Sequence, residues 1–203
     1  STGSLGQGLS VGAGLAAGLR GGAVDGPSRD DRTVFVLLGD GELQEGQVWE
    51  AAMFAGARKI DNLVAIIDQN CISAMGRVAE RMNSNPLPEK WRAFGWHVLE
   101  IDGHNIEEIV AALNAADTIK ERPTAIIAHT TKGKGFSFAE NQAAFHNGIM
   151  TQAQYELDIA KARLAQAQKD YDTLQKGPKP EEVTLADKRI ETANGRISAA
   201  NAS

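Results

Sequence analysis

Short runs rich in apolar residues recur along the first part of the chain. Residues 33–38 show no polar alternation, which is typical of a β-strand that is covered on both faces, and residues 62–67 are expected to form a second buried strand. Residues 96–101 and 124–129 are expected to form two more strands. Helical periodicity is found at residues 5–20, 42–57 and 106–116. Because strands that alternate with helices pair in parallel through right-handed crossovers, we expect an α/β fold whose mostly parallel sheet carries helices on both faces.

The first predicted helix, residues 5–20, combines a leucine-rich face with glycines at positions 6, 8, 12, 14 and 18. Glycine lets a helix approach its neighbours closely, so we expect this helix to pack tightly inside the domain.

The pattern changes after residue 150. Apolar residues then recur three and four apart from Leu157 to Leu174, which predicts one long helix over residues 151–176 with a single apolar seam. We expect the seam to dock against the domain or a partner. The sequence Gly-Pro-Lys-Pro at 177–180 breaks this helix, and residues 177–203 are expected to form a linker and a polar tail that is only weakly helical. The organisation is therefore a domain over residues 1–150 and a C-terminal helical extension.

Composition narrows the class of protein. The chain has 203 residues, of which 42% are hydrophobic and 23% charged, as in an ordinary globular protein. Its net charge of −5, with both signs interspersed, argues against a nucleic-acid partner and against a membrane surface. The single cysteine, Cys71, excludes an intrachain disulfide framework and fits a reducing, cytoplasmic location. We expect its side chain to serve in packing.

Two predicted strands end in residues with metal-type oxygens, Asp40 and Asn70. Ligands of open parallel sheets bind beyond the carboxyl ends of the strands, and Mg²⁺ is usually held by one or two carboxylates together with phosphate oxygens. Gly41 would let a backbone N–H approach a phosphate at the start of the next helix. An isolated Gly-Asp-Gly is more often a plain turn, but an Asn thirty positions downstream at a second strand end favours a split metal and diphosphate site. We expect Asp40 to lie in a solvated loop.

Longer motifs surround these two positions. They are GDGELQEGQVWEAA at 39–52, DNLVAIIDQN at 61–70, TGSLGQG at 2–8, KWRAFGWHV at 90–98, DGHN at 102–105, TTKGKG at 130–135 and FH at 145–146. Together they closely resemble the thiamine-diphosphate-binding N-terminal section of transketolases, over roughly residues 1–157. The stretch 44–50 most resembles transketolase sections encoded as separate subunits.

The resemblance implies a role for each matching residue. Asp40 and Asn70 would ligate Mg²⁺ (or Ca²⁺) through their side chains and Ile72 through its main-chain carbonyl. The residues expected to line thiamine diphosphate are Gly3, Leu5, Gly39, Gly41, Asn70 and His146, with His146 near the diphosphate. Glu45 and Glu50 match glutamates of a proton network at the subunit interface, and with His146 they form the expected catalytic set. For the two glutamates, a solvated helix face is an equally good interpretation of the residues alone.

The resemblance also implies an activity: transfer of a two-carbon ketol unit between sugar phosphates, by one half of a split active site. The other half would come from a pyrimidine-binding transketolase subunit or domain, in a dimer or heterotetramer. Substrate-binding histidines that precede the 2–8 motif in transketolases have no counterpart here, so the domain is expected to be incomplete at its N-terminus. Two alternatives stay open at this point: an E1-type thiamine-dependent component, and a noncatalytic truncated homologue that acts as a binding module.

Overall fold

The computed structural model describes residues 3–21, 32–177, 181, 184–185 and 187–192. The chain divides into two compact units, residues 1–149 and 150–203, which are treated separately below. All four predicted strands and the predicted site residues lie in the first unit.

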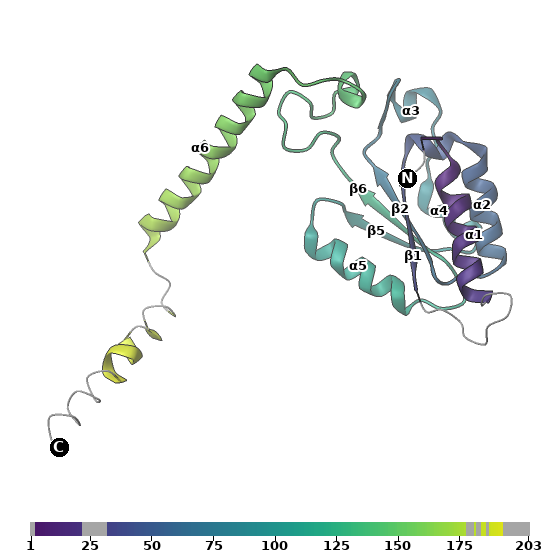
Figure 1. Ribbon diagram of the computed structural model, residues 1–203, viewed down its shortest axis with the longest axis horizontal. Coiled ribbons are helices and arrows are strands. Elements are labelled where there is room, and N and C mark those ends of the chain that lie inside the picture. The colour runs from purple at the N-terminus through teal and green to yellow at the C-terminus, as the bar shows by residue number, and fades with distance from the viewer. Residues whose placement is uncertain (1–2, 22–31, 178–180, 182–183, 186, 193–203) are drawn as a thin grey trace. The chain divides into compact units, whose positions relative to one another are not determined.

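The first unit is built on a four-stranded parallel sheet (Figure 1). Its strands are β1 (Val34–Gly39), β2 (Leu63–Gln69), β5 (His97–Asp102) and β6 (Thr124–His129), in the order β1-β2-β6-β5. In the register, Gly39 lies opposite Asp68, and Asp68 lies opposite Ala128. The predicted parallel α/β sheet is therefore confirmed, and its register brings the ends of β1, β2 and β6 together.

Helices cover both faces of the sheet, as predicted. The helices α1 (Gln7–Gly21), α2 (Gly46–Ala57) and α4 (Leu87–Ala93) lie on one face, and α5 (Ile106–Thr118) lies on the other (Figure 1). The larger core forms under the first three, where the indoles of Trp91 and Trp96 meet edge to face with ring centroids 4.7 Å apart. The smaller core joins Ala112 and Ala116 of α5 to Val64 and Ile126 of the sheet.

Several short elements connect the long ones. They are the 3₁₀ helices η1 (Gly41–Gln44) and η2 (Ala143–His146), the two-residue strands β3 (Ile72–Ser73) and β4 (Gly76–Arg77), and the one-turn helix α3 (Val78–Arg81). The sequence analysis did not predict these, nor the seven-residue helix α4. Segments this short contain too few residues for a helical or strand period to stand out.

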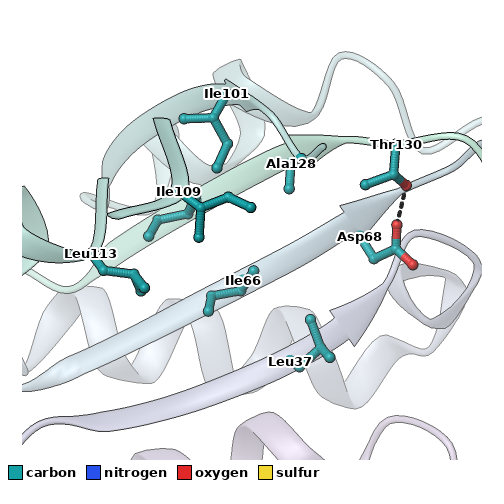
Figure 2. Close-up of a pocket in the computed structure, with 10 residues that line it drawn as sticks. Leu37, Ile66, Asp68, Ile101, Ile109, Leu113, Ala128 and Thr130 are labelled. Atoms are coloured by element: carbon teal, nitrogen blue, oxygen red, sulfur yellow. Dashed lines mark hydrogen bonds between the residues drawn. The ribbon is translucent and has the colours of Figure 1, made fainter. Parts of the chain in front are cut away.

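The expectation that the strand at 33–38 is covered on both faces is wrong. Val36 and Leu38 of β1 are buried beneath the helices, whereas Phe35 is 48% exposed and Leu37 is 72% exposed. The reason is that β1 is an edge strand and that α5 packs over β2, β5 and β6 only. Between Leu37 and α5 lies an apolar cavity of about 250 Å³ (Figure 2).

The first helix is likewise only half inside the domain. Leu9, Ala13 and Ala16 are fully buried, but Val11 and Leu15 on its opposite side are exposed. Close approach is confirmed at Gly12, where a Cβ atom would lie 2.4 Å from a Val36 methyl carbon. At positions 14 and 18, by contrast, a Cβ would meet nothing within 4 Å.

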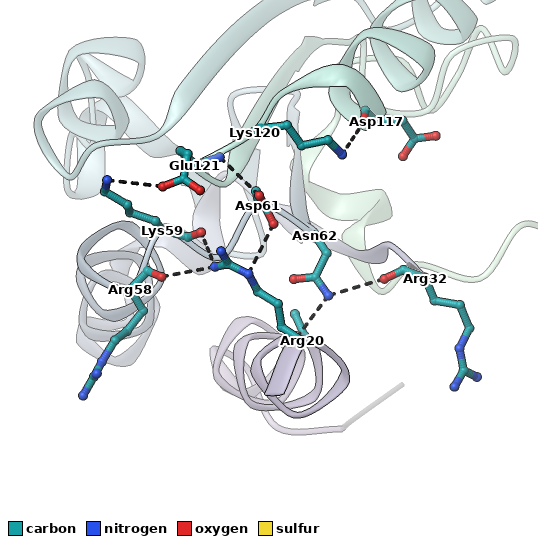
Figure 3. Close-up of polar contacts among 10 residues, drawn as sticks. Arg20, Arg32, Arg58, Lys59, Asp61, Asn62, Asp117, Lys120 and Glu121 are labelled. Carbon is teal, nitrogen blue, oxygen red and sulfur yellow. Dashed lines mark hydrogen bonds and ion pairs between the residues drawn. The ribbon is translucent and has the colours of Figure 1, made fainter. Parts of the chain in front are cut away.

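A polar network joins the elements at the amino end of the sheet (Figure 3). The guanidinium of Arg20 at the end of α1 pairs with the buried Asp61 at 3.5 Å and donates to the carbonyl oxygens of Arg58 and Lys59 after α2. Asp61 accepts a hydrogen bond from the backbone N–H of Glu121 at 3.2 Å. These contacts fix α1, α2 and the loop before β6 against one another, at the end of the sheet away from Asp40 and Asn70.

The second unit contains α6 (Gln152–Lys176). Leu157, Leu164 and Tyr171 of its apolar seam are exposed, and the docking of this seam stays a prediction. Much of the expected tail at 177–203 lies outside the described residues, and those described at 184–185 and 187–192 have helical backbone. Within the described part of the chain, no helix is both long enough and apolar enough to span a membrane.

The contact between α2 and the turn before β5 leaves no room for a side chain at Gly56. A Cβ atom there would lie 1.8 Å from the Phe94 carbonyl oxygen. We therefore expect Gly56→Ala to lower the free energy of unfolding by about 1–3 kcal/mol or more, because overpacking forces the backbone apart. Gly14→Ala is the matched control: its Cβ meets nothing within 4 Å, so the better helix propensity of alanine should raise stability by about 0.5–1 kcal/mol. Urea denaturation measures both, and an unchanged midpoint for Gly56→Ala would contradict the packing.

Candidate functional site

The carboxyl ends of the strands open into a cavity of about 410 Å³. It is lined by Leu5, Gly39, Asp40, Gly41, Glu42, Gln44, Glu45, Asp68, Asn70, Ile72, Ser73, Ala74, Met75, Lys132 and His146. The parallel register explains this gathering, because Gly39 at the end of β1 lies directly opposite Asp68 near the end of β2. The cavity therefore lies where ligands of open parallel sheets bind.

Asp40 follows β1 directly and is buried, with 3% of its surface exposed. The expectation of a solvated loop is wrong because the chain after β2 folds back over this side chain. Its Oδ2 atom accepts a hydrogen bond from the Cys71 N–H at 2.5 Å. Burial raises the pKa of Asp40 above its usual value and the nearby Asp68 adds to the rise, while backbone donors at Cys71 and Gly41 and the charge of Lys132 oppose it.

Asn70 is held by its own turn. Its Oδ1 atom accepts from the Ile72 N–H at 3.0 Å, and its Nδ2 atom donates to Asp68 Oδ2 at 3.1 Å. Between Asn70 and Ile72, Cys71 adopts a left-handed backbone with φ 63°. This turn directs the Cys71 N–H toward Asp40, so one short segment shapes the surroundings of both predicted metal ligands.

Glu42 connects two chain segments on the near side of the cavity. Its carboxylate accepts from the Gly6 N–H at 2.8 Å and from the Gly39 N–H at 3.3 Å. The loop before α1, which includes Leu5, is thereby attached to the end of β1. Glu45 occupies the position before α2, is exposed and lines the cavity.

The far wall comes from the chain after β6. Lys132 and His146 both line the cavity, His146 from the short helix η2. Lys132 brings a positive charge whose field lowers the pKa of Asp40 against the effect of burial. An anion in the cavity would therefore face a cation on this side.

Of the residues singled out in the sequence, eight share this cavity: Leu5, Gly39, Asp40, Gly41, Glu45, Asn70, Ile72 and His146. Gly3 lines a neighbouring groove instead, and Glu50 lies exposed on α2 without lining the cavity. Gly3 and Glu50 are thus not brought together with the others in this chain.

Polar contributors that sequence reasoning missed include Glu42, Asp68, Lys132 and the backbone N–H of Cys71. Asp68 and Lys132 could have been identified from the sequence. Asp68 follows a buried strand two positions before Asn70, and Lys132 is the first residue of the glycine-rich loop at 132–135. The backbone donor could not, because it depends on the conformation of Cys71 and not on its side chain. The thiol itself is exposed, so the interpretation of Cys71 as a packing residue is wrong.

The donor set fits a divalent cation that also binds a phosphate group. Within the described residues there is no cluster of three His, Cys, Asp or Glu side chains able to hold a metal alone. Asp40 is a buried carboxylate whose hydrogen bonds come from backbone N–H groups, and Asn70 adds an amide oxygen beside it. One carboxylate with neutral oxygens is the protein share of sites in which Mg²⁺ takes its remaining ligands from phosphate and water.

The chain matches known proteins over most of its length. The family model described as transketolase, thiamine diphosphate binding domain, covers residues 1–189. The 6-deoxy-6-sulfo-D-fructose transketolase subunit SqwG of Clostridium sp. (strain MSTE9) is 44% identical, over 79% of this chain and 56% of that protein. An apulose-4-phosphate transketolase subunit of Phocaeicola vulgatus is 43% identical, over 77% of this chain and 53% of that protein. The chain thus spans about half the length of these curated relatives.

Solved structures agree with the sequence matches. The crystal structure of transketolase from Campylobacter jejuni superimposes with a TM-score of 0.65 and 40% identity, over 70% of this chain and 22% of that one. The fold, the motifs and the family match lead to one conclusion, which confirms the resemblance seen in the sequence. The chain belongs to the transketolase family and carries its thiamine diphosphate binding domain.

Proposed function

We propose that this chain forms the diphosphate-binding half of a transketolase-type active site, which transfers a two-carbon ketol unit from a ketose phosphate to an aldose phosphate. The observation that carries the proposal is the cavity in which Asp40, Gly41, Asn70 and His146 meet at the strand ends. The similar proteins from Clostridium and Phocaeicola are both named as transketolase subunits, which favours ketol transfer over an E1-type decarboxylation.

Different residues of the cavity would bind the metal ion and the diphosphate group of the cofactor. Asp40 and Asn70 would bind Mg²⁺ (or Ca²⁺) with their side-chain oxygens, and Ile72 with its carbonyl oxygen. The backbone N–H of Gly41, the ammonium group of Lys132 and the imidazole of His146 would face the diphosphate. When bound, thiamine diphosphate supplies the thiazolium carbanion, and the protein supplies position and electrostatics.

The second half of the site would come from elsewhere. No described residue is assigned to the aminopyrimidine end of the cofactor, and Glu45 stands exposed at the cavity rim. We place Glu45 and Glu50 at the junction with a pyrimidine-binding transketolase subunit or domain, in a dimer or heterotetramer. Closure by that partner would exclude water and strengthen the charge interactions inside. Retention of Asp40 and Asn70 argues against a purely noncatalytic module.

The metal assignment predicts the behaviour of Asp40→Asn. The amide keeps an acceptor for the Cys71 N–H, so the fold should survive, but the loss of the charge should weaken binding of thiamine diphosphate with Mg²⁺ about 100-fold or more. Calorimetric titration measures the affinity. Asp102→Asn, which changes an exposed carboxylate at the end of β5 outside the cavity, is the control and should bind normally. Equal affinity in the two variants would refute the assignment of Asp40.

The split-site assignment predicts a dependence on the partner. The isolated chain should show little or no ketol transfer, and activity should appear on addition of a separately expressed pyrimidine-binding transketolase domain. Glu45→Ala should reduce the reconstituted activity about 10²-fold, as loss of a proton-transfer group does, with little effect on metal binding by the chain. Glu107→Ala, on the opposite face of the sheet in α5, is the matched control. Full activity from a monomer identified by light scattering would contradict the split site.

A further inference from the structure

Asp68 lies within the 61–70 motif but has no role assigned above, yet it hydrogen-bonds to residues at both proposed metal ligands. Its main-chain carbonyl oxygen accepts from the Asp40 N–H at 3.2 Å. Its Oδ2 atom accepts from Nδ2 of Asn70 at 3.1 Å. Its Oδ1 atom accepts from the hydroxyl of Thr130, which follows β6 (Figure 2). One residue at the end of β2 therefore connects three strand ends.

The hydrogen bond between Asp68 and Asn70 fixes the orientation of the Asn70 side-chain amide. A carboxylate accepts hydrogen bonds and offers none, whereas a side-chain amide has a donor end and an acceptor end. Of the two ends of the Asn70 amide, only the NH₂ group can therefore bond to Oδ2 of Asp68. The amide oxygen is then left on the other side, where it meets the Ile72 N–H. A rotated amide would lose both bonds and would turn donors, not an acceptor, toward a cation.

Thr130 fixes the carboxylate in turn. Its hydroxyl occupies Oδ1 of Asp68, and its backbone N–H donates to the Gln69 carbonyl oxygen at 3.2 Å. Oδ2 is thereby the oxygen left for Asn70. The orientation of the Asn70 amide is thus set by the neighbouring strand β6 and not only by its own turn.

We propose that Asp68 is a positioning residue, whose carboxylate holds the Asn70 amide so that its oxygen faces the cation of the metal and diphosphate site. The inference rests on the proposed function for the presence of that cation. Asp68 would not bind the cation itself. It would hydrogen-bond to Asn70, the proposed metal ligand, as residues next to metal-binding side chains commonly do to orient them.

The test is Asp68→Asn, which keeps the size of the side chain. If its new oxygen accepts from Thr130, its new NH₂ group faces Asn70, and the Asn70 amide must rotate. We expect the side-chain amide signals of Asn70 in ¹⁵N NMR spectra to shift and to lose their contact pattern with the Ile72 N–H. Affinity for thiamine diphosphate with Mg²⁺, measured by calorimetry, should fall about 10- to 100-fold. Asp102→Asn, the same change at an exposed carboxylate that does not line the cavity, is the matched control, and its affinity should change less than about threefold.

A double-variant cycle separates positioning from simple charge attraction. If Asp68 acts through Asn70, then Asp68→Asn should weaken binding no further in a chain that already carries Asn70→Ala. Losses that add in the double variant would overturn the proposal, and so would unchanged Asn70 amide signals in Asp68→Ala, whose side chain offers the amide no acceptor. Asp68→Ala provides a second test with the same expected loss of affinity if Asp68→Asn does not fold.

The failure of the proposed function gives a different result. If the wild-type chain shows no binding of thiamine diphosphate with Mg²⁺ by calorimetry, both the cation site and the role of Asp68 toward it are refuted. A wild-type chain that binds, with Asp68→Asn equally tight, refutes the positioning role alone.

Discussion

The parallel pairing of β1 with β2 is the constraint on which the site depends. Parallel strands end at the same edge of a sheet, so residues that follow them are brought together whatever their separation in sequence. At the end of this pairing, the Asp40 N–H donates a hydrogen bond to the Asp68 carbonyl oxygen. From that point the chain after β2 turns back, places the Cys71 N–H on the Asp40 carboxylate and sets Asn70 beside it. A shift of one residue in the register would move all three apart.

The two ends of the sheet serve different purposes. At the amino end, charged groups are paired with one another: Arg20 meets Asp61, and Lys59 meets Glu121 at 3.4 Å (Figure 3). At the carboxyl end, Asp40 is buried with backbone donors for partners and has a raised pKa. Burying a charged carboxylate that has no ion-pair partner lowers the stability of the folded state unless a cation binds to it. The first end stabilises the fold, and the second presents a buried carboxylate to the cavity of the proposed metal site.

The sequence by itself determined the class of fold and much of the site. Continuous apolar runs such as 62–67 are strands because β-branched and aliphatic residues fit a sheet buried on both faces, and their alternation with helices leaves parallel pairing as the simple solution. Asp40 and Asn70 were identifiable because oxygen-bearing residues follow two such runs. Local pattern is sufficient for these features since each depends on the residue types of one short segment and its neighbours.

Only the tertiary structure decided which side chains face which partners. Phe35 and Leu37 have the composition of buried residues, but they are exposed because β1 lies at the sheet edge and α5 does not reach it. Asp40 is buried, and Asp68 reaches both Asn70 and Thr130, because segments that are distant in the sequence converge at one strand end. The sequence contains these residues but not their distances. Those follow from register and packing, which depend on the whole set of contacts and not on any one segment.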